Sequence, residues 1–199
     1  MALTVAFVAS ANAAMIVNNG TPNQSGGSDL ITNISADDFT LTDTYIINLV
    51  RYWTLQDNAG SYTGPTDWSV LADSSGAPGS AVASGSFTAT QAATGQSASG
   101  LSEFEHTAAV SISLGPGTYW FALSSSSSSP GSVNWAFNNA VSGNAQAFEI
   151  GVGPWGSISA ELAFQLEGDL DSGIPEPSTY GLISAGLIAI VAHRRRRAA

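Results

Sequence analysis

The sequence predicts an all-β protein: an antiparallel, jelly-roll-like β-sandwich of about eight or nine strands, followed by a C-terminal transmembrane helix. Three observations predict this fold. Between about residues 30 and 168, apolar and polar residues alternate in short runs, as in strands with one buried face. Clusters of Gly, Pro, Asn and Asp separate these runs. Near the C-terminus, an uncharged apolar run precedes four arginines, a pattern typical of a membrane-spanning segment.

The first fourteen residues have the composition of an export signal. They carry no charge, and they end in Ala11-Asn12-Ala13, the small-x-small pattern that a signal peptidase accepts. We therefore expect the export machinery and signal peptidase to act here, with cleavage after Ala13 or Ala14. The basic residues that open such peptides are missing, so we expect the natural start to lie upstream of Met1. An ordinary apolar strand is the alternative.

The body of the chain contains the predicted strands. In the first run we expect Tyr45, Ile47, Leu49 and Trp53 to share one face, around Tyr52 on the other. Turn signals lie at 57–60, 74–79 and 115–117, and the serines at 124–129 predict an exposed loop. The alternating runs lie at 45–54, 110–114, 119–123, 133–137, 148–152 and 162–166.

Composition excludes several classes of function. The 199 residues carry five basic and fifteen acidic side chains, a formal net charge of −10, and Arg51 is the only cation before the C-terminal arginines. Such an acidic body repels nucleic-acid phosphates, so we expect no nucleic-acid partner. The absence of cysteine excludes a disulfide, a Cys-ligated zinc and a cysteine nucleophile.

The C-terminal segment joins three parts in order. Pro175-Glu176-Pro177, followed by Ser178, predicts a stiff extended peptide, because a residue before proline avoids helical angles. Residues 178–193 predict an apolar helix about 24 Å long, somewhat short of a hydrocarbon core of about 30 Å. A basic cluster then stays cytoplasmic by the positive-inside rule and places the domain outside the inner membrane. That cluster consists of Arg194, Arg195, Arg196 and Arg197.

Residues 174–199 resemble the PEP-CTERM sorting signal. The resemblance implies that an exosortase, a membrane-embedded transpeptidase-like enzyme, processes the tail. It also implies transient anchoring in the inner membrane, delivery to the cell surface or extracellular matrix, and an association with extracellular polysaccharide. A tail anchor that no enzyme cleaves is the alternative. The body, with Asp67-Trp68 in one of its motifs, is similar to a β-sandwich ectodomain that recurs before such tails, and this similarity implies no activity.

These patterns divide the chain into four parts. Residues 1–14 are expected to be a signal peptide, and residues 15–168 a β-sandwich ectodomain. Residues 169–177 are expected to be a linker with the Pro-Glu-Pro motif, and residues 178–199 a transmembrane helix with a basic tail. The function we expect is that of an exported surface or matrix protein with a structural, adhesive or carbohydrate-contacting domain.

Candidate catalytic residues are few, and we expect no enzyme and no catalytic residue. His106 is the only histidine in the body, but no Gly-x-Ser-x-Gly elbow accompanies it. Glycoside hydrolysis needs two facing carboxylates, for which the candidates are Glu103 with Glu105, or Glu161 with Glu167. Ordinary solvent-facing positions explain these glutamates equally well. An exported polysaccharide-active hydrolase is therefore the alternative function.

We expect no cofactor, with calcium left open and without a defined ligand set. Zinc prefers imidazole and thiolate, which are nearly absent, whereas calcium takes oxygen ligands. Asp169-x-Asp171-x-Gly173 fails the EF-hand order, as do the other acidic groups. The aspartates considered are Asp29, Asp37, Asp38 and Asp43 in one group, and Asp67 and Asp73 in another.

Five tryptophans are many for this length, and aromatic faces stack on sugar rings. If Tyr119 faces the core with Phe121, its neighbour Trp120 points outward. Trp120 and Trp68 are therefore the candidate carbohydrate contacts. Core packing is the alternative for every one of these aromatic residues.

Overall fold

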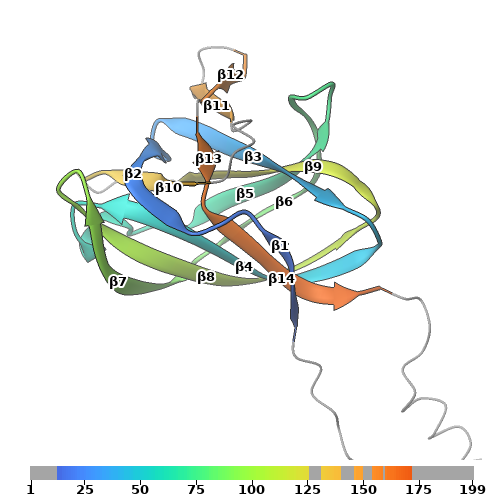
Figure 1. Ribbon diagram of the computed structural model, residues 1–199, viewed down its shortest axis with the longest axis horizontal. Helices are drawn as coiled ribbons and strands as arrows, with labels where there is room; N and C mark the ends of the chain where they lie inside the picture. The colour runs from blue at the N-terminus through green and yellow to red at the C-terminus, as the bar shows by residue number, and fades with distance from the viewer. Residues whose placement is uncertain (1–12, 126–130, 140–145, 150–153, 159, 172–199) are drawn as a thin grey trace, which may run out of the picture.

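The structure is a computed structural model that describes residues 13–125, 131–139, 146–149, 154–158 and 160–171. Within these ranges the chain forms two antiparallel sheets packed face to face, a β-sandwich (Figure 1). This confirms the predicted all-β class. No helix in the described ranges is long and apolar enough to cross a membrane. The helix predicted within residues 178–199 lies outside those ranges.

One sheet has eight strands in the described ranges. The strands β7, β8, β4, β14 and β1 are neighbours in that order. β14 pairs with most of β4, and β10 pairs with the last residues of β4 on the same side. β10 also pairs with β2 and β13. The strands of this sheet are β1 (Ala14–Asn18), β2 (Pro22–Asp29), β4 (Tyr45–Gln56), β7 (Thr90–Ala98), β8 (Leu101–Leu114), β10 (Val133–Asn138), β13 (Glu161–Leu162) and β14 (Phe164–Leu170).

The second sheet has six described strands in the order β12-β11-β3-β9-β5-β6. A short 3-10 helix, η1 (Ala59–Ser61), follows β4 where the sequence predicted a turn, and the Asn58 side chain accepts a hydrogen bond from Gly60 N at 2.8 Å. The strands of this sheet are β3 (Asn33–Leu41), β5 (Thr66–Asp73), β6 (Pro78–Phe87), β9 (Gly117–Ser125), β11 (Gln146–Glu149) and β12 (Gly156–Ser157).

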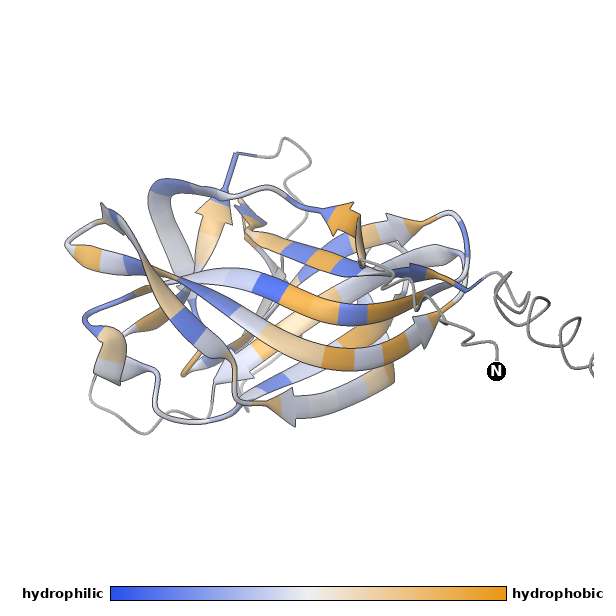
Figure 2. Cartoon of the chain, turned by 90° about the horizontal axis from the view of Figure 1, so that it is seen from below, coloured by the Kyte–Doolittle hydropathy of each residue, from blue (hydrophilic) through white to orange (hydrophobic). Residues whose placement is uncertain are grey.

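Aromatic side chains fill the space between the sheets. Phe121 of β9 lies edge-on to Trp135 of β10, with ring centroids 5.9 Å apart, and Phe164 of β14 packs against both rings. All three side chains are fully buried. Burying a side chain of this size contributes about 2–3 kcal/mol, and paired rings add to this. Figure 2 shows the alternation of apolar and polar residues along the strands that produces this core.

A β-bulge in β4 changes which residues face the core. The ladder with β14 shifts between Ile47 and Leu49, which pair with the consecutive residues Gly168 and Glu167, so Asn48 is an extra residue and the alternation inverts after it. Tyr52 therefore joins Ile47 in the core, with neither side chain exposed. Trp53 lies on the opposite face and packs there in a second, smaller cluster. The predicted shared face of Ile47 and Trp53 was wrong for this reason.

The strand count differs from the expected eight or nine, because the described ranges contain fourteen strands. Most of the unpredicted length lies in β6 and β7, which consist largely of Ala, Ser, Gly and Thr and lack apolar alternation. The predicted run 162–166 is divided at Ala163 into β13 and β14. Ile150 and Val152, expected in a strand, lie outside the described residues.

The first described strand, β1, pairs with the last one, β14. β14 lies between β4 and β1, and Ala14 at the start of β1 is opposite Gly168 near the end of β14 (Figure 1). After β14, Asp171 N donates to Thr44 O at 2.8 Å. Strand β14 and its hydrogen bonding therefore extend into the segment expected to be a linker, through residues 169–171. The first described strand therefore begins, and the last one ends, at the same end of the domain.

Gly168 permits this close packing. A Cβ atom at this position would lie 2.1 Å from Ile46 O and 2.8 Å from Ile16 Cδ1, closer than real Cβ contacts. The backbone of β4 cannot move away without disturbing the ladders on both sides of β4, with β14 and with β8. We predict that Gly168→Ala lowers the free energy of unfolding by about 2–3 kcal/mol, measured by urea denaturation.

The matched control is Gly115→Ala, because a Cβ at Gly115 has no atom within 4 Å and its φ is not positive. This control should leave the denaturation midpoint nearly unchanged. Equal midpoints for the two variants would contradict the assigned packing of β14 against β4.

Candidate functional site

The residues predicted to direct export and sorting flank the described domain on both sides. Ala13 immediately precedes β1, and the described chain ends at Asp171, one residue beyond β14. Ala11 lies outside the described residues. So do Pro175, Glu176, Pro177, Ser178, Arg194, Arg195, Arg196 and Arg197. The structure therefore places the N-terminal and C-terminal boundaries of the domain side by side, on the neighbouring strands β1 and β14.

Inside the domain, three carboxyl groups meet beside β13. Asp37 of β3 is fully buried, and its Oδ2 accepts hydrogen bonds from Leu162 N at 2.6 Å and Asn19 Nδ2 at 2.8 Å. Carboxylate oxygens of Asp37, Asp38 and Glu161 all lie within 4.8 Å of one another. The sequence placed Asp37 and Asp38 among the acidic candidates but gave no signal that Glu161 would join them.

The electrostatics of this cluster favour a bound proton. Burial, reinforced by the nearby Glu161 carboxyl, raises the pKa of Asp37 from 3.8 to about 8, although the hydrogen bond from Leu162 N opposes the shift. Asp37 is therefore neutral at pH 7 and relieves the repulsion with Glu161, which is also buried. A calcium ion here would have to displace that proton, and calcium binding stays a prediction.

The other candidate aspartates do not join this cluster. Asp29 closes its own turn by accepting from Ile31 N and Thr32 Oγ1, both at 2.8 Å. Asp73 accepts from Trp120 Nε1 at 2.9 Å, and this bond, with one from Gly76 N, holds the pKa of Asp73 below its usual value. Asp43 and Asp67 are exposed, each in or next to a turn or strand end. These aspartates stabilise turns or lie at the surface.

Replacing Asp37 tests the protonated carboxyl. Between pH 3.8 and about 8 the folded chain keeps a proton on Asp37 that the unfolded chain releases, so stability falls as pH rises. Buried His106 titrates in the unfolded chain near pH 6.5, so its opposite effect is largest below that pH and fades above it. We therefore predict that the free energy of unfolding falls between pH 6.5 and 8, by at most about 1.4 kcal/mol per pH unit.

The variant Asp37→Asn keeps an oxygen for Leu162 N but has no proton to lose. Its unfolding free energy, followed by urea denaturation, should be nearly constant over the same pH range. Asp43→Asn, at an exposed turn residue, should retain the wild-type slope. A wild-type slope in Asp37→Asn would show that another group causes the pH dependence.

His106 is part of a buried polar cluster. Its Nε2 lies 2.8 Å from Thr54 Oγ1 and 3.1 Å from Gln56 Nε2, and its ring stacks on Tyr52 with centroids 4.7 Å apart. Burial lowers the pKa of His106 to about 3, so the ring is neutral. Within the described ranges its Nδ1 has no hydrogen-bond partner, and hence no acid orients it as in a Ser/His/acid triad. A fully buried ring has no access to a substrate.

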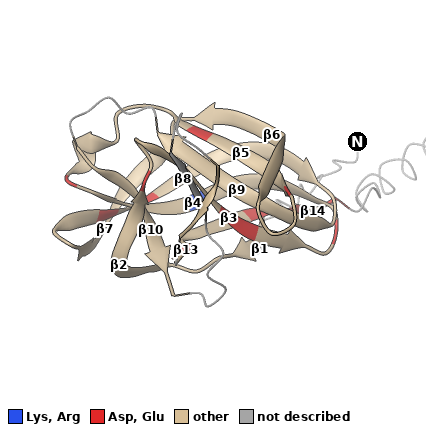
Figure 3. Cartoon of the chain, turned by 90° about the horizontal axis from the view of Figure 1, so that it is seen from above, with Lys and Arg blue, Asp and Glu red and all other residues tan. Residues whose placement is uncertain are grey.

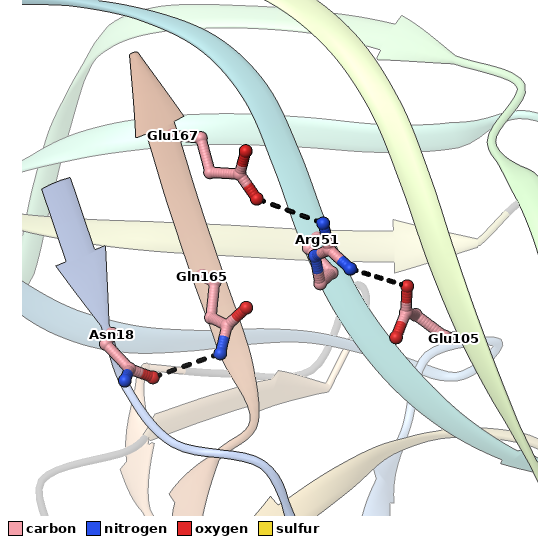
Figure 4. A network of polar contacts seen from close by, with 5 residues as sticks. All are labelled: Asn18, Arg51, Glu105, Gln165 and Glu167. Atoms are coloured by element: carbon pink, nitrogen blue, oxygen red, sulfur yellow. Dashed lines mark hydrogen bonds and ion pairs between the residues drawn. The ribbon is translucent and has the colours of Figure 1, made fainter. Parts of the chain in front are cut away.

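The glutamates proposed as carboxylate pairs have other partners (Figure 4). Arg51 donates to Glu105 Oε1 at 2.8 Å and to Glu167 Oε1 at 3.0 Å, which joins β8 and β14 across β4. Glu103 Oε2 accepts from Gln24 Nε2 at 2.6 Å. Glu161 lies beside Asp37 and not beside Glu167. The structure thus brings Glu105 and Glu167 together through Arg51, a pairing that the sequence did not predict.

Removing Arg51 should leave two carboxylates facing each other without a cation. We predict that Arg51→Gln lowers the free energy of unfolding by about 1 kcal/mol at low salt and by less in high salt, because these partly exposed charges are screened. Adding Glu167→Gln to this variant should recover part of the loss. An unchanged stability at low salt would mean that the ion pairs contribute nothing measurable.

The tryptophans are mainly structural. Tyr119 does face the core as predicted, and Trp120 points to the other face of the sheet, but Trp120 is only 1% exposed and packs with Leu71 and Trp155. Its ring is not available to stack on a sugar, so this part of the prediction is corrected. Trp68 is partly buried against the core and lies over Gly85. A carbohydrate contact at Trp68 stays a prediction.

Comparison with known proteins identifies the tail. The PEP-CTERM protein-sorting motif matches residues 173–197, starting two residues beyond Asp171. The chain therefore carries the motif of exported proteins that an exosortase processes during membrane-linked sorting. This confirms the resemblance read from the Pro-Glu-Pro segment, the apolar run and the arginines. No curated protein matches the chain.

Proposed function

We propose that the mature protein is a component of the cell surface or extracellular matrix and that its β-sandwich has a structural or adhesive role. The observation that carries this proposal is the position of the sorting motif. It begins at residue 173, directly after a strand that is paired on both sides. An enzyme that cuts within the motif would leave all the described strands in the released domain, because the last of them, β14, ends at Leu170, before the motif begins.

The tail acts in three steps in this proposal. The apolar segment at 178–193 spans or enters the inner membrane, and the four arginines hold its end in the cytoplasm. The six residues that follow Asp171, up to Pro177, reach at most about 20 Å, so the domain stays close to the membrane surface. Exosortase then cuts near the Pro-Glu-Pro segment, and the domain moves to its final position outside the cell.

The alternative of an exported polysaccharide hydrolase receives less support. A glycosidase needs one carboxylic acid and one carboxylate facing the scissile bond in an accessible site. Glu105 and Glu167 are instead joined by Arg51, and Glu103 is buried against Gln24. These contacts favour a non-catalytic domain.

Sorting is tested by intact mass and cell fractionation in hosts with and without an exosortase. In the host with the enzyme, we predict a released chain that lacks the residues after the Pro-Glu-Pro segment. Without the enzyme, the full tail should remain and the chain should fractionate with the membrane. An intact membrane-bound tail in both hosts would reduce the motif to an anchor.

A substitution sharpens this test. Glu176→Ala, at the centre of the Pro-Glu-Pro segment, should leave the full-length chain in the membrane even when the exosortase is present. Ser172→Ala lies one residue before the matched motif and should be processed like the wild type. Equal processing of the two variants would show that Glu176 is not recognised.

A further inference from the structure

The outer edge of β6 is an open sheet edge. Among the described strands β6 pairs with β5 alone, so the backbone N–H and C=O groups on its other side have no strand partner there. Its segment Ala83–Phe87 pairs regularly with Thr66–Val70, whereas the ladder shifts on the N-terminal side of Ala83. The three central residues of the segment, 84–86, are exposed. A straight run of five residues is therefore available for pairing.

The segment Ala83–Phe87 lacks the usual protection of an edge strand, because Pro78 and the register shifts of β6 lie on its N-terminal side. Natural edge strands carry lysines, inward-pointing charges, prolines or bulges that prevent pairing with another chain. No charged residue occurs between Ser74 and Ser102, which includes all of β6 and β7, and β6 is uncharged along its length in Figure 3. Ala83, Ser84 and Ser86 are small, and Gly85 lies flat against the Trp68 ring. The segment is therefore uncharged, narrow and open to close approach.

We propose that Ala83–Phe87 pairs antiparallel with the same segment of a second copy, so that the six-stranded sheets of two domains form one continuous sheet. An edge strand is self-complementary about a two-fold axis, because each copy offers the other the same pattern of donors and acceptors. The proposal adds an interaction to the proposed function and does not depend on how the tail is sorted.

Charge distribution favours a second copy at this edge. The described chain has one cation, Arg51, among many carboxylates, so most faces of two copies repel each other. The acidic residue paired with this segment is Asp67, opposite Ser86 on β5. In the paired sheets Asp67 and its counterpart would be three strand spacings apart, about 14 Å. This exceeds the screening length of about 8 Å at physiological salt.

The absence of cysteine makes this pairing testable in the full chain. Ser84→Cys introduces one thiol at the edge, and a residue within one position of the two-fold axis lies within about 8 Å of its counterpart. Ser102→Cys is the matched control, because Ser102 is exposed but has β4 on one side and β7 on the other. Both variants are treated with a bis-maleimide of this span, on intact cells and after purification.

We expect Ser84→Cys to give at least about fivefold more covalent dimer than Ser102→Cys, with a mass of two copies. Equal yields would overturn the proposal. A covalent product that joins one copy to a different protein would overturn the choice of a second copy as the partner.

A charge placed on the edge provides an independent check. With the thiol moved to Ser86→Cys, adding Ser84→Glu should reduce the dimer yield about fivefold to tenfold, because two carboxylates would lie within about 8 Å of each other across the new pair. Adding Ser102→Glu instead should leave the yield unchanged. An undiminished yield with Ser84→Glu would mean that cross-linking does not arise from β6 pairing, and the proposal would be wrong.

Discussion

The pairing of β14 with both β4 and β1 is the constraint on which the rest of the structure depends. β14 supplies Phe164 and Leu166 to the core and Glu167 to the Arg51 ion pairs. It is also the last strand before the sorting motif. The domain therefore cannot close until the end of the chain is available, since β1 has no other strand partner in the described ranges. Because of this strand order, the fold is completed only when β14, the strand next to the tail, has been added.

This topology also explains how the domain can remain intact when its tail is pulled or cut. A load on the tail acts on β14, which is held by two ladders and by the close packing of Gly168 against Ile46. Disulfides, which stabilise many exported domains, are absent because the chain has no cysteine. Stability instead comes from the aromatic core and from sheet pairing.

Buried titratable groups complete that core in their neutral forms. Burial raises the pKa of Asp37 and lowers the pKa of His106, and in each case the form favoured by burial is the uncharged one. Neither group therefore places a charge between the sheets at pH 7. Their partners are hydrogen-bonding groups from strands or segments far apart in sequence, such as Asn19 for Asp37 and Thr54 for His106.

The sequence predicted those elements whose pattern lies in consecutive residues. β4, β9 and β10 were predicted because their apolar residues alternate, and the sorting motif because its three parts are contiguous. The bulge at Asn48 was not predicted, since an extra residue in a ladder has no local signature. β6 and β7 were missed because exposed edge strands need no apolar face. The meetings of Asp37 with Glu161 and of Arg51 with Glu167 depend on strand order, which alternation does not determine.

The division of charge along the chain connects sorting with the final state of the protein. Four of the five cations lie at the C-terminus, and no acidic residue follows Glu176. A cut after the Pro-Glu-Pro segment would therefore remove four positive charges and change the formal net charge from −10 to −14. The released domains would repel one another over most of their surface. Contact between copies would then depend on uncharged regions. The long stretch without charge between Ser74 and Ser102 contains β6 and β7, each of which is an edge strand among the described strands. Removal of the tail would thus increase the selectivity of contacts between domains, because it leaves the uncharged edges as the places where two copies can approach.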